Sequence, residues 1–542
     1  MKKILLLSGF AILFGATTIN QDKFFEITKN IEIFANVYKE INANYVDEID
    51  PSKLMKAGVD AMLKTLDPFT NYISEAQIEN YRLVVEGKYN GIGAQAKKIG
   101  DWVTITEVYK DYPAFKAGLK IGDKVISVNN LSAKGKESED LNTIMRGAPK
   151  SEVDLVIERP GESGQKSIKI IRDEVNIPNV PYSGMLDEET GYIILSTFTQ
   201  DAGKNVQNAL QTLKKENAGL KYLIFDLREN GGGLLHEAVE VCNTWLPGGQ
   251  IVASTRSKSK DRDQYFKTRK AGIDESIKLA VLINGHSASA SEIVSGTIQD
   301  LDRGVVIGQL SYGKGLVQNT KDVGYNAKVK LTTSKYYIPS GRCIQSVSYD
   351  ESGAAVKVPD SLRSEFKTKN GRKVYDGGGV TPDVEVKSAD HPKIVQSLLE
   401  SFLLFNYCTE LQLKGQIPTD AKSYEFIDFE DFMAYLRKNN FDDRSSFEKK
   451  LDELEKLAKE ESNSTINKDL SEIRNELNNA QWEELMKEKT LISNLIEEEM
   501  VSRTFYQEGK LQKKLTQDPL IVEAKKILKD QNRYNSILSI KQ

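Results

Sequence analysis

The chain has 542 residues, of which 39% are hydrophobic and 28% are charged, as is typical of a soluble globular protein with room for three or four domains. Its formal net charge of -4 gives no reason to expect nucleic acid as a partner. The three cysteines are widely spaced, which excludes a disulfide framework, and three histidines without an HExxH motif exclude a zinc peptidase of that type.

The first 20 residues have the pattern of an export signal. A basic start, Met1-Lys2-Lys3, precedes an apolar run over residues 4–14. We therefore expect residues 1–20 to be a cleaved signal peptide and the protein to be exported, periplasmic or associated with a bacterial cell envelope. An uncleaved anchor is the alternative, weakened because the run is shorter than the ~20 residues that a membrane span needs.

Residues 21–86 are predicted to be helical. Apolar residues recur at helical spacing at Ile27, Ile31, Phe34, Tyr38, Ile41 and Tyr45. Asp50-Pro51 then supplies an N-cap and a first-turn proline for a second amphipathic helix.

Residues 87–172 are predicted to form a small β-rich domain. Gly91 and Gly93 precede the alternating apolar residues of a strand near Val103, and further turn signals separate it from a second strand at residues 125–128.

Residues 173–389 have the alternation of strands and helices that predicts an α/β core. Apolar strands are expected at residues 191–195, 222–226 and 279–283, with a helix around residues 209–215. Three glycines at residues 231–233 follow the second strand. Glycine lets backbone N–H groups approach a ligand closely.

The third strand leads into three alternating serines, Ser287, Ser289 and Ser291, and then into a helix. Ser289 and Glu292 have the S-x-x-E spacing of a capping box. Further on, Lys314 stands between two glycines in an apolar neighbourhood, where a neutral lysine amine can accept the proton of a serine nucleophile. The residues alone do not choose among the serines, and an N-cap serine with a surface lysine fits the same pattern.

Several sequence motifs occur together, and their order resembles that of the carboxyl-terminal processing (tail-specific) serine peptidases with a PDZ domain. They are LDPFTNY at residues 66–72, PAFKAGLKIGD of the PDZ-like domain at 113–123, DLRENGGG at 226–233, SASASEI at 287–293, GKGLVQ at 313–318, YYIPSGRCIQ at 336–345 and GGGVTPD at 377–383. The resemblance covers roughly residues 30–385. It implies a multidomain α+β protein with N-terminal helices, a PDZ-like β-rich domain, a crotonase-like α/β peptidase core and a C-terminal helical tail.

The resemblance also assigns roles to single residues. It makes Ser289 the nucleophile, Lys314 the general base and Gln318 the residue that orients the lysine. It implies an oxyanion hole formed by a glycine N–H, Gly232 or alternatively Gly233, together with the N–H of Ala290. No metal or other cofactor is expected.

In the PDZ-like domain the resemblance assigns the loop that accepts a peptide's terminal carboxylate. The loop residues are Tyr89, Asn90, Gly91, Ile92 and Gly93. The expected partners are therefore proteins or peptides with exposed, apolar carboxyl ends.

Residues 390–542 have the spacing of amphipathic helices, at Phe447, Leu451, Leu454 and Ala458 and again at Ile466, Leu470, Ile473 and Leu477. A helical buttress on the enzyme, a homodimer contact and an adaptor-binding surface are all compatible with this pattern.

The function predicted is that of a serine endopeptidase with a Ser-Lys dyad that recognises substrate tails. Two other classes remain as alternatives, a non-catalytic PDZ scaffold that binds protein carboxyl ends and an enzyme of the same core fold that acts on thioesters. A histidine base, His236 or His286, is the alternative within serine chemistry, although no carboxylate partner for it is indicated.

Overall fold

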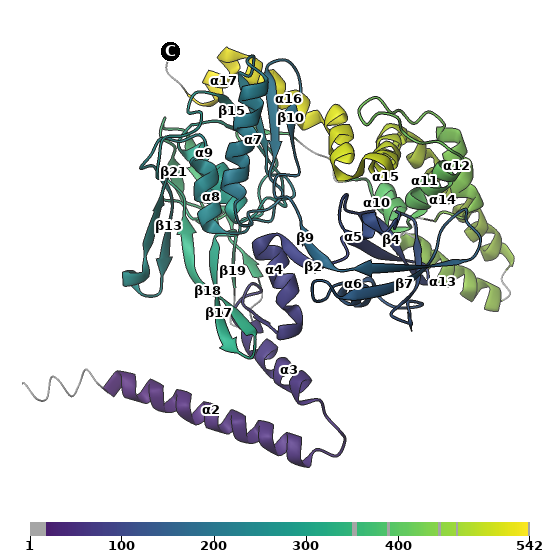
Figure 1. Ribbon diagram of the computed structural model, residues 1–542, viewed down its shortest axis with the longest axis horizontal. Helices are drawn as coiled ribbons and strands as arrows, with labels where there is room; N and C mark the ends of the chain where they lie inside the picture. Colours follow the sequence, from purple (N-terminus) through teal and green to yellow (C-terminus); the bar gives the residue numbers. More distant parts are fainter. Residues whose placement is uncertain (1–17, 350–354, 387–390, 443–445, 462–463, 540–542) are drawn as a thin grey trace, which may run out of the picture. The chain divides into compact units, whose positions relative to one another are not determined.

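The computed structural model describes residues 18–349, 355–386, 391–442, 446–461 and 464–539 (Figure 1). The chain forms two compact units. The described part of the first comprises residues up to 75, 318–332, 349 and 355–356, and the second comprises the rest. Within the described ranges, no helix has both the length and the apolar character needed to cross a bilayer. Residues 1–17 of the predicted signal peptide lie outside these ranges.

The first unit contains the two predicted N-terminal helices, α2 (Thr18–Asn44) and α3 (Pro51–Lys64). The predicted cap of α3 is confirmed, because the Asp50 carboxylate accepts the N–H groups of Ser52 and Lys53. Strand β1 (Asn71–Ile73) pairs with the first half of β18 (Ala327–Tyr337), which also pairs with β17 (Leu316–Gly324).

The second unit begins with helix α4 (Ile78–Glu86) and the predicted β-rich domain. Its sheet has the order β3-β4-β5-β7-β8, so β3 lies at one edge. Strand β7 shows why a sheet forms, because Val153, Leu155 and Ile157 alternate with polar residues and are fully buried. The elements are η1 (Glu75–Gln77), β2 (Lys88–Gly91), β3 (Ala94–Ile99), β4 (Trp102–Val108), α5 (Pro113–Lys116), β5 (Lys124–Val128), β6 (Leu131–Ser132), α6 (Ser138–Met145), β7 (Glu152–Glu158), β8 (Gln165–Ile171) and β9 (Asp173–Asn176).

The predicted α/β core is a second sheet with the order β10-β11-β12-β15-β16-β23. Its strands run parallel from β11 onward and read as continuous apolar runs because both faces are covered. The strands are β10 (Tyr182–Met185), β11 (Thr190–Ile194), β12 (Tyr222–Asp226), β15 (Lys278–Ile283), β16 (Val305–Gly308) and β23 (Val384–Glu385). The helices of one face are α7 (Ala202–Glu216), α8 (Leu235–Cys242) and α9 (Ala290–Asp300).

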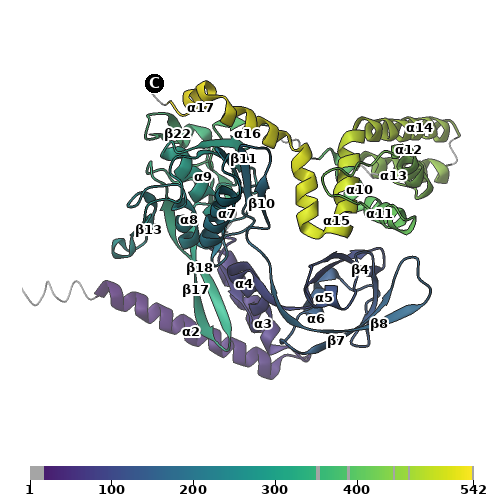
Figure 2. The same cartoon turned by 45° about the horizontal axis from the view of Figure 1, so that its top comes forward.

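The opposite face of this sheet is covered by the end of the chain. Figure 2 shows α16 (Pro519–Lys529) and α17 (Gln531–Ile537) beside the strands of the core. Leu520, Ile527 and Leu528 are buried in one cluster with Ile224 and Leu282 of the sheet. The last part of the tail is thus a buttress of the α/β core.

The rest of the tail is a separate helical cluster within the second unit. Of the apolar positions predicted here, Leu451, Ala458, Leu470 and Leu477 form one apolar contact group, whereas Leu454, Ile466 and Ile473 are 52%, 44% and 38% exposed. The helices are α10 (Lys393–Glu400), α11 (Leu403–Leu413), α12 (Phe429–Lys438), α13 (Ser446–Glu460), α14 (Ser464–Lys487) and α15 (Lys489–Gln517).

The remaining elements are short. Strand β13 (Ile251–Ser257) pairs with β14 (Gln264–Lys267) and with the second half of β18. The others are η2 (Lys260–Arg262), β19 (Val347–Tyr349), β20 (Ala355–Lys357), η3 (Asp360–Leu362), β21 (Glu365–Lys367) and β22 (Lys373–Tyr375). The predicted fold class, helices and β-rich domain ahead of an α/β core and a helical tail, is confirmed.

Candidate active site

Three neighbouring parallel strands bring the predicted catalytic segments to one edge of the sheet. Asp226 at the end of β12 lies beside Leu282 of β15, and Ile283 of β15 lies beside Gly308 of β16. The glycines at 231–233 (the glycine loop) follow β12. The serines at 287–291 (the serine turn) follow β15, and residues 313–315 around the lysine (the lysine segment) follow β16. Because the carboxyl ends of parallel strands meet at the same edge, this is where an α/β sheet ordinarily binds its ligand.

The serine turn distinguishes the three alternating serines. Ser287 and Ser291 are fully buried, and their hydroxyls donate to the carbonyl oxygens of Leu227 (2.8 Å) and Asn230 (2.7 Å). Ser289 is partly exposed and has φ 57° and ψ -112°, a conformation that non-glycine residues rarely adopt. Such strain costs about 1–3 kcal/mol and is found mainly at functional sites. The geometry favours Ser289.

Glu292 links the serine turn to the lysine segment. Its Oε2 accepts the N–H groups of Ser289 (2.8 Å) and Lys314 (2.9 Å), so the predicted capping interaction is present and extends further. Its Oε1 accepts the N–H of Gly313 (2.7 Å) and the hydroxyl of Ser311. Burial raises the pKa of Glu292 above its usual value, and these hydrogen bonds oppose the rise. One buried carboxylate therefore fixes the backbone at both candidate catalytic residues.

Tyr336 makes a second link between the same two residues. Its hydroxyl donates to the carbonyl oxygen of Lys314 at 2.7 Å and lies 3.1 Å from that of Ser289. Burial raises the pKa of Tyr336 well above its usual value, so the hydroxyl keeps its proton. The partly buried Lys314 is thus held in a fixed loop.

The glycine loop lies directly against the serine turn. A Cβ on Gly232 would be 2.8 Å from the Ser289 Cβ and 3.0 Å from the Ala290 nitrogen, so only glycine fits there. The N–H of Gly232 donates to the Asn230 side chain at 2.9 Å, whereas the N–H of Gly233 has no acceptor among the described residues. Ala290 opens α9, where backbone N–H groups lack helical acceptors.

Gln318 belongs to the first compact unit. It lies on β17, four residues after Lys314 in the sequence, and its side-chain nitrogen donates to the Thr332 hydroxyl at 3.2 Å across the β17–β18 pair. This hydrogen bond fixes the side chain within its own unit.

The predicted carboxylate loop lies partly in a strand, because Tyr89, Asn90 and Gly91 belong to β2, which pairs with β9, and only Ile92 and Gly93 connect β2 with β3. Tyr89, Asn90 and Ile92 are buried, and the N–H of Asn90 is 3.3 Å from a Glu79 carboxylate oxygen. Arg146 stacks over the Tyr89 ring, 5.3 Å from its centre, and brings a positive charge to the loop.

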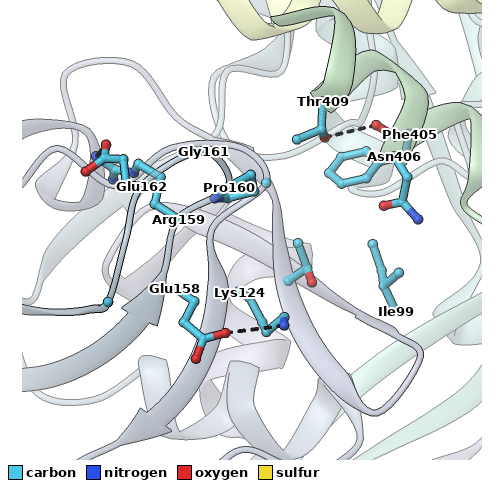
Figure 3. A pocket seen from close by; sticks show the side chains of 13 residues that line it. Ile99, Lys124, Glu158, Arg159, Pro160, Gly161, Glu162, Phe405, Asn406 and Thr409 are labelled. Carbon is cyan, nitrogen blue, oxygen red and sulfur yellow. Dashed lines mark hydrogen bonds and ion pairs between the residues drawn. The ribbon is translucent and has the colours of Figure 1, made fainter. Parts of the chain in front are cut away.

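A separate pocket lies between the β-rich sheet and α11. It encloses about 440 Å³, and Figure 3 shows Lys124 and Glu158 paired on one side of it with Phe405 and Thr409 on the other. None of the predicted catalytic or carboxylate-loop residues lines this pocket. It is therefore distinct from the candidate active site.

Comparisons with known proteins identify the family and its domains. The model of peptidase family S41 matches residues 189–353, a PDZ domain model matches residues 104–159, and a model described as the C-terminal helical domain of probable PDZ-proteases matches residues 394–528. A carboxy-terminal-processing protease of Bartonella bacilliformis is 31% identical over 346 residues, covering 64% of this chain and 79% of the relative. The chain belongs to peptidase family S41. The predicted family resemblance is confirmed.

The chain spans less than two thirds of the length of the Staphylococcus aureus relatives that it matches. A probable CtpA-like serine protease of Staphylococcus aureus (strain COL) is 34% identical over 318 residues, which is 58% of this chain and 62% of that relative. Among solved structures, a photosystem II D1 C-terminal processing protease is 24% identical, covering 65% of this chain and 92% of that one with a TM-score of 0.35.

Sequence reasoning on this S41 member missed two residues that hold the site together. The sequence indicated Glu292 only as part of a capping box, and Tyr336 only as part of the YYIPSGRCIQ motif. The S-x-x-E spacing was the available signal for Glu292. Nothing in the sequence indicated that Tyr336 contacts the backbone of both Ser289 and Lys314.

Proposed function

We propose that the protein is a serine endopeptidase in which Ser289 is the nucleophile and Lys314 the general base. The observation that carries the proposal is the strained, partly exposed Ser289 held to the Lys314 backbone by the buried Glu292. The Ser289 oxygen bonds to the scissile carbonyl carbon while the neutral lysine amine takes its proton. The lysine then protonates the leaving amine as the peptide C–N bond breaks. Water hydrolyses the resulting ester and restores both residues.

The transition state carries a negative oxygen that needs hydrogen-bond donors. The N–H of Ala290 is one candidate, and the adjoining glycine loop supplies the other. Because the Gly232 N–H already donates to Asn230, we favour Gly233 as the second donor over Gly232. In this account Gln318 orients the lysine.

Substrate tails would bind to the PDZ domain. Strand β3 is an edge strand, and α6 lies beside it, since the Ser138 hydroxyl accepts the N–H of Lys98 at 2.8 Å. An extended peptide adds to such an edge as a further strand. Its terminal carboxylate would enter the carboxylate loop at Tyr89–Gly93, beside the charge of Arg146. We propose proteins with apolar carboxyl ends as substrates and an adaptor protein as a further partner. The chain would be exported and would cleave its substrates in the cell envelope.

We propose the following domain organisation for the chain. Residues 1–20 direct export, 21–86 form the N-terminal helical region, 87–172 the PDZ domain, 173–389 the peptidase core and 390–542 the helical region.

A homodimer is proposed through α2. Phe24, Ile27, Ile31 and Phe34 repeat with alternating steps of three and four residues and are 73%, 57%, 64% and 55% exposed. This is the spacing of a coiled-coil seam. The flanking residues at positions 28, 30, 35 and 37 carry no charge, so a second copy meets no repulsion there. Sedimentation of Ile27→Lys should give monomers where the wild type gives dimers, and a wild-type monomer would exclude this contact.

The proposed activity is tested by mass spectrometry of an unfolded protein with an apolar carboxyl end. It is incubated with residues 21–542 as wild type, Ser289→Ala and Lys314→Ala. Cleavage by the wild type alone supports the dyad. Equal cleavage by all three refutes it, and binding of the tail without cleavage identifies a non-catalytic scaffold.

A further inference from the structure

The buried Arg228 guanidinium joins the glycine loop to the far end of the chain. Its Nε lies 3.0 Å from Asp226 Oδ2 at the end of β12, and its Nη1 lies 2.7 Å from Oδ2 of Asp518. The three side chains are only 16%, 1% and 5% exposed, respectively. Asp518 lies at the start of α16, in the C-terminal helical region.

The charges make this contact strong. Burial by itself lowers the pKa of Arg228, but the neighbouring Asp226 and Asp518 outweigh it and raise the pKa well above its usual value. Asp226 also accepts the Tyr192 hydroxyl at 2.8 Å and is therefore fully engaged. Charge-assisted hydrogen bonds of this kind are roughly twice as strong as neutral ones and define geometry.

Arg228 stands at the start of the loop that lies against the nucleophile. Its own N–H donates to Asp226 at 2.9 Å, and two residues later Asn230 accepts the Gly232 N–H at 2.9 Å. The Asn230 carbonyl oxygen accepts the Ala288 N–H at 3.0 Å, which ties the loop to the serine turn. Arg228 and the glycines beside Ser289 thus belong to one short, hydrogen-bonded stretch of chain.

Asp518 is itself held firmly. Its Oδ1 accepts the N–H of Leu520 at 2.9 Å as the N-cap of α16, while its Oδ2 faces Arg228. Leu520 and Ile521 seat the helix on the sheet at 2% and 3% exposure. The N-cap of α16 thus presents a fixed negative charge to Arg228.

We propose that Asp518 is a positioning residue for the oxyanion hole, acting through Arg228. It does not touch substrate; it holds the loop so that its N–H groups meet the developing oxyanion. The inference rests on the proposed peptidase function, and it makes the C-terminal helical region a functional part of the active site.

The test is Asp518→Asn, which keeps an N-cap acceptor and removes the charge facing Arg228. The matched control is Asp187→Asn. Asp187 also pins α16 to the core, through Lys525 at 2.8 Å and Lys529 at 3.0 Å, but lies away from Arg228. The readouts are thermal stability and the kcat and KM for a fluorogenic peptide built around a cut mapped in the wild type.

We expect Asp518→Asn to lower kcat about tenfold with KM within about twofold, because oxyanion donors act in the transition state. Asp187→Asn should lower the melting temperature with kcat near wild type, and Asp518→Glu should recover part of the rate. Equal kcat losses in the two Asn variants, or a wild-type kcat in Asp518→Asn, would overturn the positioning role. Cleavage retained in Ser289→Ala would instead refute the underlying peptidase assignment.

Discussion

The buried Glu292 offers a sharp prediction, because Glu292→Gln keeps the shape of the side chain and replaces one acceptor oxygen by a donor. If the amide oxygen stays toward Ser289 and Lys314, the new NH₂ group faces the Gly313 N–H, which loses its acceptor. A buried donor without a partner costs about 1–3 kcal/mol. In the reverse orientation two donors are orphaned, at roughly 2–6 kcal/mol.

The free energy of unfolding of the variant should therefore be about 1–3 kcal/mol lower than that of the wild type. The lost contacts should also displace Ser289 and Lys314. Since about 1.4 kcal/mol of transition-state stabilisation is tenfold in rate, kcat should fall at least roughly tenfold with little change in KM. Because the base is a neutral lysine, kcat of both enzymes falls on the acid side; the raised pKa of Glu292 predicts a further loss at lower pH that the variant lacks. The measurements are chemical unfolding and a pH profile of kcat.

Ser311→Ala is the control for this prediction. It removes a donor to the other oxygen of Glu292 and leaves the contacts to Ser289 and Lys314 in place. Its stability should fall, while kcat should stay within about threefold of wild type. A Glu292→Gln enzyme with a kcat within twofold of wild type would refute the idea that this carboxylate holds the dyad.

Three further variants test other contacts of the peptidase core. Gly232→Ala should abolish cleavage, because φ is +99° there and the new Cβ would lie 2.7 Å from a carbonyl oxygen of the serine turn. The control Gly231→Ala, whose Cβ would have nothing within 4 Å, should cleave normally. An active Gly232→Ala would contradict the close approach. Burial alone would raise the pKa of Asp274, but Lys214 and other hydrogen-bond donors lower it to about 2. The ionised carboxylate therefore stabilises the folded state fully above pH ~4, and this stabilisation is lost toward pH 2. Melting curves should show Asp274→Asn less stable than wild type at pH 7, by a margin that shrinks as the pH falls below about 4, and a pH-independent margin would argue against an ionic origin. Ile527→Ala should cost about 2–5 kcal/mol in urea unfolding if α16 is a structural part of the core, and a cost below 1 kcal/mol would argue that it is not.

Much of the core could be predicted from local pattern. The apolar runs at residues 222–226 and 279–283 are strands β12 and β15, because a parallel strand buried on both faces needs continuous apolar residues. The cap of α3 and the start of α9 followed from Asp50-Pro51 and the spacing of Ser289 and Glu292. These features depend only on neighbours in the sequence.

Contacts between distant segments could not be predicted in this way. Amphipathic spacing shows that a helix buries one face, but not that α16 covers the sheet while α13 packs on α14. The family resemblance selects Ser289, but the physical distinction among the serines is the burial of Ser287 and Ser291, which depends on carbonyl groups some 60 residues earlier in the chain. The approach of Asp518 to Arg228 has no local signal at all.

The most direct test of the account is to locate the reactive serine chemically. The protein is treated with a fluorophosphonate probe at neutral pH, and the labelled peptide is sequenced by mass spectrometry, with Ser287→Ala, Ser289→Ala and Lys314→Ala treated in parallel. The account predicts one label, on Ser289, that persists in Ser287→Ala, is slowed strongly in Lys314→Ala and is absent from Ser289→Ala. A label on another residue, or labelling of Ser289 at the wild-type rate in Lys314→Ala, would contradict the Ser-Lys assignment.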